Sequence, residues 1–120
     1  MLDKWALELR TKKFALEVIA LVSSLPKNRI TDVLGYQLLK AGTSIGANYR
    51  EANRAESRND FIHKIGIVEK EASETQYWLE LIEESKIGGT EMVGKLKSEA
   101  GELLAIFTAI GRKCKLGKSK

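Results

Sequence analysis

Residues 61–82 read FIHKIGIVEKEASETQYWLELI, and this stretch contains the pattern that decides the fold. Its apolar and small residues recur at alternating spacings of four and three, at Phe61, Ile65, Val68, Ala72, Thr75, Leu79 and Ile82. A repeat of 3.5 residues keeps one stripe of side chains against a neighbouring helix, whereas a half-buried strand would alternate every two residues. The stretch therefore predicts a long helix that is packed along its whole length.

The same spacing continues on both sides of this segment. Towards the N-terminus it returns at Leu34, Leu38, Ala41, Ile45, Asn48, Ala52 and Ala55, and before them at Leu7, Thr11, Phe14, Val18, Leu21 and Leu25. Towards the C-terminus it returns at Val93, Leu96, Ala100, Leu103, Phe107, Ile110 and Cys114. Four such stripes predict four helices, and flanking apolar residues widen them beyond what the seams need, at Trp5, Tyr49, Trp78 and Leu81.

Helix stop and start signals separate the four stripes. Pro26 ends the first helix, because a residue that precedes proline is driven out of the helical region. Thr31 and Asp32 are expected to cap the second helix, and residues 57–60 (SRND) resemble a capping box that opens the third. Residues 88–90 (GGT) are expected to close the third helix with a left-handed residue and then to cap the fourth.

The connections between the stripes are short, so consecutive helices must run antiparallel. The sequence thus predicts an all-α, up-down-up-down four-helix bundle over residues 1–116, followed by a short basic tail at 117–120. The chain has 120 residues, 43% hydrophobic and 30% charged, which is the balance of a single folded domain. A lone cysteine, no recognisable signal peptide and no apolar run of bilayer length favour a cytoplasmic protein with no membrane partner.

The residue inventory argues against an enzyme. Asp60 and His63 have the i, i+3 spacing of a di-iron carboxylate motif, but such sites need the motif twice and the chain has one histidine. Cys114 falls on the fourth stripe and is expected to be a small core residue rather than a nucleophile. We therefore expect no catalytic residues, no metal site and no cofactor.

Residues 38–52, LLKAGTSIGANYREA, are the most distinctive part of the sequence, and residues 71–81, EASETQYWLEL, add to it. With these segments the chain resembles, over roughly residues 4–116, the bacterial four-helix-bundle proteins encoded within intervening sequences of large-subunit ribosomal RNA genes. A relative of that family, the accessory variability determinant of diversity-generating retroelements, assembles as a pentamer and works beside a reverse transcriptase on nucleic acid. The resemblance implies a ring-shaped homo-oligomer here, with a pentamer favoured, and it carries over no catalytic residues.

Two features of the second helix have structural interpretations. Asn48 occupies an apolar stripe position, and we expect it to be buried and hydrogen-bonded to Thr11 in a polar layer that fixes helix register. A patch of small residues allows another backbone to approach closely, either inside the protomer or at a subunit boundary, and both interpretations stay open. The residues expected at a subunit boundary are Gly42, Ser44, Gly46, Tyr49 and Glu51.

Charge is distributed unevenly along the predicted bundle, although the net charge is only +4. One end collects the start of the first helix, the second inter-helix turn and the C-terminus. Thirteen cations are expected there, at Lys4, Arg10, Lys12, Lys13, Arg50, Arg54, Arg58, Lys64, Arg112, Lys113, Lys115, Lys118 and Lys120. Five anions oppose them, at Asp3, Glu8, Glu51, Glu56 and Asp60. Helix dipoles explain a few of these cations and not the excess.

The leading hypothesis is a non-enzymatic oligomeric module that binds RNA or DNA through this basic end. The residues expected to contact phosphate are Arg50, Arg54, Arg58, Lys12, Lys13, Arg112, Lys113 and Lys115. The first three are expected to act as anchors, aligned at i, i+4 and i+8 where the helix continues. The alternative is a structural or protein-interaction scaffold whose basic end binds an acidic partner such as a polymerase.

Overall fold

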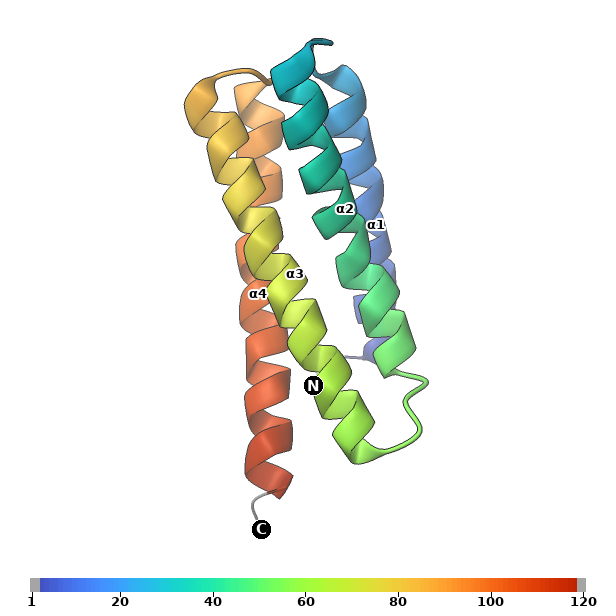
Figure 1. Cartoon of the computed structure of the whole chain (residues 1–120). Coiled ribbons are helices and arrows are strands. Elements are labelled where there is room, and N and C mark those ends of the chain that lie inside the picture. The colour runs from blue at the N-terminus through green and yellow to red at the C-terminus, as the bar shows by residue number, and fades with distance from the viewer. Residues whose placement is uncertain (1–2, 119–120) are drawn as a thin grey trace.

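A computed structural model describes residues 3–118, and most of this range is helical. Helix α1 spans Lys4–Ser24, α2 spans Arg29–Ala52, α3 spans Arg58–Ser85 and α4 spans Thr90–Lys118. The helices lie side by side and alternate in direction (Figure 1), so the predicted all-α four-helix bundle is confirmed. Helix α4 continues to Lys118, into the stretch expected to be a tail. Residues 119–120, with Lys120, lie outside the described residues, as does the side chain of Lys118.

Polar side chains cap the starts of the first three helices. Asp3 accepts a hydrogen bond from the backbone N–H of Trp5 at 3.0 Å, and Ser57 accepts one from that of Asp60 at 3.1 Å, as the capping-box pattern predicted. The expectation that Thr31 or Asp32 caps α2 is wrong, because Asn28 is the N-cap. Thr31 is instead the third helical residue, and it exchanges hydrogen bonds with Asn28 at 3.0 and 3.1 Å.

The end of α3 differs from the sequence expectation in its left-handed residue. That residue is Lys86, with φ of 58°, and no glycine in the described range has a positive φ. Gly88 is instead required by close packing, because a Cβ at this position would lie only 2.9 Å from Cδ2 of Leu25. The α3–α4 connection therefore packs against the end of α1, which closes that end of the core.

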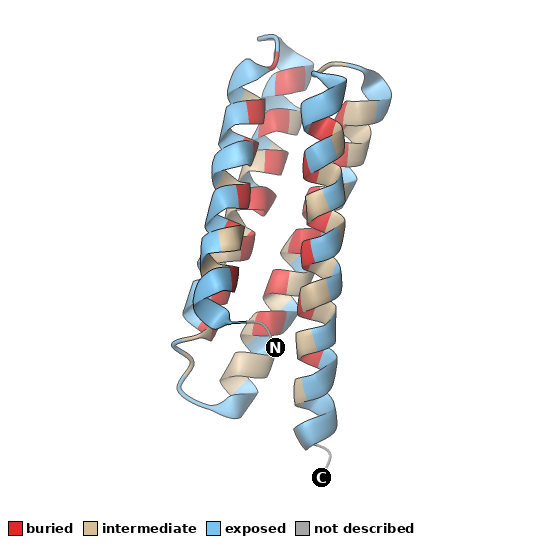
Figure 2. Ribbon diagram, turned by 180° about the vertical axis from the view of Figure 1, so that it is seen from behind, coloured by how far each residue is buried: buried red, intermediate tan, exposed pale blue. Residues whose placement is uncertain are grey.

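The core lies along the axis of the bundle, and the buried positions face one another across it (Figure 2). The predicted stripes supply most of it, including the fully buried rings of Phe14 and Phe107. Tyr49, which flanks the stripe of α2, is also buried and packs edge-to-face on Phe107 with ring centroids 5.1 Å apart. Asn48 and Cys114, which the stripes placed in the core, are only half-buried.

Two glycines explain why Tyr49 and not Asn48 enters the core. A Cβ on Gly42 would lie 3.0 Å from Cγ2 of Val18, and one on Gly46 would lie 3.1 Å from Oγ1 of Thr11. Helix α1 therefore packs closely against the side of α2 that carries Gly42 and Gly46. Tyr49 follows on that same side and so turns towards the core. Both glycines serve packing inside the protomer, and Gly42 and Tyr49 are buried there, so the subunit-boundary expectation is wrong for these two residues. Gly46 is half-buried, and its place at a subunit boundary stays a prediction.

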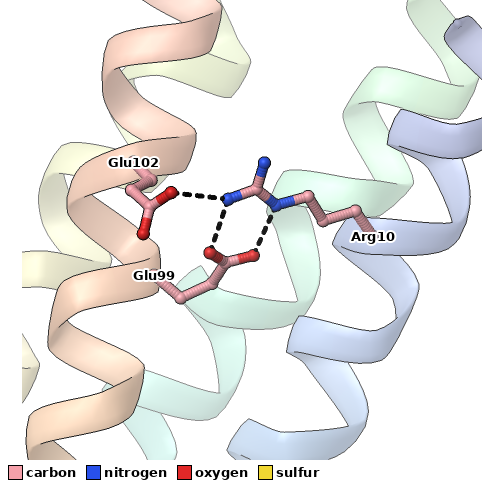
Figure 3. A network of polar contacts seen from close by, with 3 residues as sticks. All are labelled: Arg10, Glu99 and Glu102. Atoms are coloured by element: carbon pink, nitrogen blue, oxygen red, sulfur yellow. Dashed lines mark hydrogen bonds and ion pairs between the residues drawn. The ribbon is translucent and has the colours of Figure 1, made fainter. Parts of the chain in front are cut away.

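The seam between α1 and α4 is the thinnest of the four, because these two neighbouring helices contact each other least. Arg10 bridges this seam (Figure 3). Its Nε and one Nη bind the two carboxylate oxygens of Glu99 at 2.7 Å each, and the same Nη reaches Glu102 at 3.1 Å. The hydrogen bonds to Glu99 raise the pKa of the Arg10 guanidinium, which stays charged.

Candidate functional site at the basic end

The start of α1, the α2–α3 connection at residues 53–57 and the end of α4 lie together at one end of the molecule (Figure 1). The up-down-up-down topology produces this arrangement, and it brings the predicted cations onto one surface. We call this surface the basic end. Its charged side chains border two separate hollows, one on each side of the bundle.

The first hollow, the α1–α2 groove, has a volume of about 430 Å³. Lys12 of α1, Arg50 of α2 and Arg54 of the following turn line it. Small residues such as Gly46 and Ala47 also line this groove. Their small side chains let the two helices pack closely and at the same time leave the groove open. Three of the predicted phosphate-contacting residues thus meet here.

The second hollow, the α3–α4 hollow, has a volume of about 620 Å³ and is lined by Arg58, Arg112 and Lys113. The guanidinium of Arg58 donates a hydrogen bond to the backbone carbonyl of Cys114 at 3.1 Å. This contact places a positive charge near the C-terminus of α4, where the helix dipole favours it. Lys115 lines an adjacent hollow together with Arg112. The second set of predicted contacts is therefore also assembled.

The expected alignment of Arg50, Arg54 and Arg58 along one continuing helix is wrong. Helix α2 ends at Ala52, Arg54 lies in the turn, and Arg58 is the first residue of α3. Arg50 and Arg54 face the α1–α2 groove, whereas Arg58 is held against α4. The three arginines thus belong to two hollows, and Arg58 has a structural contact of its own.

Part of the positive charge is compensated by carboxylates whose pairings the sequence pattern did not identify. Glu8 is 12% exposed, lies 3.6 Å from Nε of Arg50 and accepts a hydrogen bond from the Asn53 amide at 2.8 Å. Lys64 pairs with Asp60 at 3.4 Å, and Arg10 is bound to α4. The i, i+4 spacing could have predicted the Lys64 pair. The position of Glu8 beside α2 depends on helix register, which the pattern does not give.

Seven cations at the basic end are exposed and form no ion pair within the described range, 3–118, but Lys4 lies over the Trp5 ring and Arg58 donates a hydrogen bond to α4, so five have side chains without such a contact. They are Lys12, Lys13, Arg54, Arg112 and Lys113. Lys13 lines neither hollow, so it is the one predicted contact of α1 that the fold does not bring to them. The remaining four divide between the α1–α2 groove and the α3–α4 hollow.

The predicted polar pair of Asn48 and Thr11 does not form. Thr11 is fully buried, as expected, but its hydroxyl donates to the carbonyl of Glu8 at 3.0 Å. The Asn48 amide donates to the carbonyl of Ser44 at 2.8 Å, so each side chain bonds within its own helix. The reason is the rotation of α2, which turns Tyr49 towards the core and Asn48 away from it. Burial raises the pKa of the Tyr49 phenol, although its hydrogen bond with Asn53 acts in the opposite direction.

Among the described residues, no cluster of histidine, cysteine and carboxylate side chains has the arrangement of a metal site. His63 is exposed on α3, while Cys114 is half-buried near the end of α4. None of the helices in this range has both the length and the apolar content needed to cross a bilayer. Ser44 is half-buried and Glu51 is exposed, so both predicted boundary residues reach the surface.

Comparison with known proteins gives consistent matches. A family model described as 23S rRNA-intervening sequence protein matches residues 7–109. The chain is 37% identical to a crystal structure from Bacteroides thetaiotaomicron, described as a protein of unknown function from the S23 ribosomal protein family. That likeness has a TM-score of 0.79 and covers 86% of this chain and 95% of the other. No curated protein matches the sequence.

Proposed function

The chain belongs to the 23S rRNA-intervening sequence protein family, and from this premise and the geometry of the basic end we propose that it is a non-enzymatic, oligomeric module that binds nucleic acid. The observation that carries the proposal is the set of five exposed, unpaired cations at one end of the bundle, Lys12, Lys13, Arg54, Arg112 and Lys113. Exposed lysines and arginines without an ion pair attract phosphates. Their contact with a nucleic acid releases the counterions that are condensed on it.

The two hollows support phosphate contacts of different kinds. In the α1–α2 groove, Lys12 and Arg54 border a surface of small side chains, which leaves room for a sugar–phosphate backbone. In the α3–α4 hollow, Arg58 holds the end of α4 in place, and Arg112 and Lys113 supply the exposed charge. Arginine binds phosphate with two parallel hydrogen bonds, so Arg54 and Arg112 are the anchors in this proposal.

Assembly strengthens the proposal, because a cyclic homo-oligomer places every basic end on one rim. Each protomer then needs only a few phosphate contacts, since a polyanion that spans neighbouring subunits binds through several of them at once. A pentamer is the assembly that we favour. The protein would bind sequence-independently through its rim, with affinity that falls steeply as salt rises.

The test is a titration of labelled single-stranded RNA and duplex DNA at about 50 and 200 mM salt, read by fluorescence anisotropy. The variant is Lys12→Gln/Arg54→Gln/Arg112→Gln. If each side chain contacts one phosphate, the slope of log K against log salt on duplex DNA should become shallower by roughly 2–3. The variant should keep its helical content, because all three side chains are exposed.

The matched control is Lys27→Gln/Arg29→Gln/Lys95→Gln, which removes the same charge from exposed positions at the opposite end. This control should keep nearly the wild-type slope. Equal losses in both variants would mean that net charge and not the basic end governs binding. If neither RNA nor DNA binds at low salt, the nucleic-acid proposal is wrong, and the basic end is left for an acidic protein partner.

A further inference from the structure

Trp5 is an exposed tryptophan at the basic end, on the first turn of α1. It is 64% exposed and lies outside the hydrophobic core, although tryptophan is highly buried on average. The Nζ atom of Lys4 lies over its ring, 5.5 Å from the ring centroid. The residues that line the two hollows are aliphatic, polar or charged. Trp5 therefore adds to the basic end an aromatic surface that the phosphate contacts proposed above do not use.

Two lysines lie on the outer side of α1 beyond Trp5. Lys12 and Lys13 follow Trp5 by seven and eight residues, close to two helical turns, which places them about 11 Å further along the helix. Both are exposed, and neither forms an ion pair with another described residue. Leu9, one turn after Trp5, is 68% exposed between them. The outer side of α1 at the basic end thus combines an aromatic ring, an apolar side chain and positive charge.

The nearby carboxylate does not cancel this charge. Glu8 is the acidic residue within 4–16, and it is directed towards α2. There it lies 3.6 Å from Nε of Arg50 and accepts a hydrogen bond from the Asn53 amide at 2.8 Å. The surface around Trp5 is therefore positive, and it fits a polyanion that also carries flat aromatic groups. Single-stranded nucleic acid has this chemistry.

A tryptophan ring can stack on a base only when the base is free of the duplex. Inside a duplex each base is already stacked and paired, so an enzyme or binding protein must first flip it out at an energetic cost. In a single strand the bases are open, and they stack readily on aromatic side chains. Because every base has a π-face, such stacking tolerates any sequence.

We propose that Trp5 is a base-stacking platform, through which the basic end binds single-stranded nucleic acid, RNA or DNA, in preference to a duplex. The inference rests on the proposed function, because it names the class of nucleic acid that the basic end binds. One base lies against the Trp5 ring, with Lys4 beside it. Lys12 and Lys13, whose side chains are long and flexible, contact the phosphates of neighbouring nucleotides. Lys13, which lines neither hollow, has its role on this surface.

The test compares four labelled probes by fluorescence anisotropy at about 50 mM salt. They are a single-stranded RNA, a DNA strand of the same length, an abasic DNA strand with the same number of phosphates, and a DNA duplex. The wild-type protein should bind both intact single strands more tightly than the abasic strand, by about 5-fold or more for each stacked base. Trp5→Ala should lose this preference and bind the abasic strand and the duplex almost unchanged.

Two variants are matched to Trp5→Ala. Trp5→Phe keeps a ring and should retain most of the preference for intact strands. Tyr36→Ala removes an aromatic residue that is 61% exposed in the first half of α2, away from the basic end, and should bind all four probes like the wild type. Circular dichroism should report the same helical content for all three variants, because both side chains are largely exposed.

Fluorescence supplies a second readout. In a Trp78→Phe background Trp5 is the single tryptophan, and intact single strands should quench its emission while the abasic strand should not. Equal affinity for intact and abasic strands would overturn the stacking inference and leave the proposed function standing. Equal losses from Trp5→Ala on all four probes would also overturn it, because the ring would then serve the fold or the assembly. If no probe binds, both proposals are wrong, and the exposed ring is left for a protein partner.

Discussion

Replacing Gly42 with alanine tests whether close approach of α1 and α2 is what requires a glycine there. The new Cβ would lie 3.0 and 3.2 Å from the two methyl carbons of Val18. Val18 is fully buried, and its β-branched side chain has one strongly preferred rotamer in a helix. The valine cannot rotate away, so the substitution forces α1 and α2 apart or strains the core.

The magnitude follows from two opposing effects. Alanine is favoured over glycine by about 1 kcal/mol in a helix interior, while overpacking a core costs about 1–3 kcal/mol. Gly42→Ala should therefore lower the free energy of unfolding by about 1 kcal/mol. Gly66→Ala is the matched control, because it lies within α3 and a Cβ there would meet nothing within 4 Å. That substitution gains the helix propensity alone and should stabilise the protein by about 1 kcal/mol.

The assay is thermal unfolding followed by circular dichroism, with all variants at the same protein concentration. At about 4 °C per kcal/mol for a domain of this size, the two variants should differ in Tm by roughly 8 °C. Gly42→Ala/Val18→Ala should show favourable coupling in a double-mutant cycle, because the smaller side chain removes the clash. A Gly42→Ala protein as stable as Gly66→Ala would refute the reasoning.

Arg10→Met should lower the free energy of unfolding by about 1 kcal/mol, because the pair with Glu99 is bidentate yet only partly shielded from water. A double-mutant cycle with Glu99→Gln that shows no coupling would contradict this. Glu71→Gln should stabilise the protein at pH 7, because burial and then the charge of Glu74 raise the pKa of Glu71 and penalise its charged form. In urea unfolding this gain should vanish as pH falls through the folded-state pKa, and a gain that persists near pH 3 would point to another cause. Ser57→Ala should cost about 1 kcal/mol by removing the N-cap of α3, and Ser57→Thr should recover most of it in the same assay.

The number, order and direction of the helices could be predicted from the sequence because heptad spacing and turn residues are local properties of the chain. The level and rotation of one helix against another are not local. Asn48 and Tyr49 are adjacent, and the choice between them depends on how closely α1 approaches Gly42 and Gly46. The stripe of α4 differs in the same way, since Gly111 is buried and Cys114 is only half-buried.

That the cations gather at one end of the bundle could likewise be predicted, but how they are arranged there could not. Up-down-up-down topology suffices to gather Lys12, Arg54 and Arg112 at one end. Which cations remain without an ion pair depends on the carboxylates that lie opposite them. Glu8, for example, lies opposite Arg50. Arg10 was counted with the basic end, yet carboxylates 89 and 92 residues away in sequence bind it.

The thin seam between α1 and α4 has a consequence for the order in which the molecule opens. Helix α3 packs closely on both of its neighbours, whereas α1 packs closely on α2 alone and is tied to α4 through Arg10. In native-state hydrogen exchange, the backbone amides of α1 should therefore exchange through a partial opening that leaves α2, α3 and α4 together, while those of mid-α3 should require global unfolding. Added salt should speed exchange in α1 more than in α3, because it weakens the ionic link that holds α1 to α4.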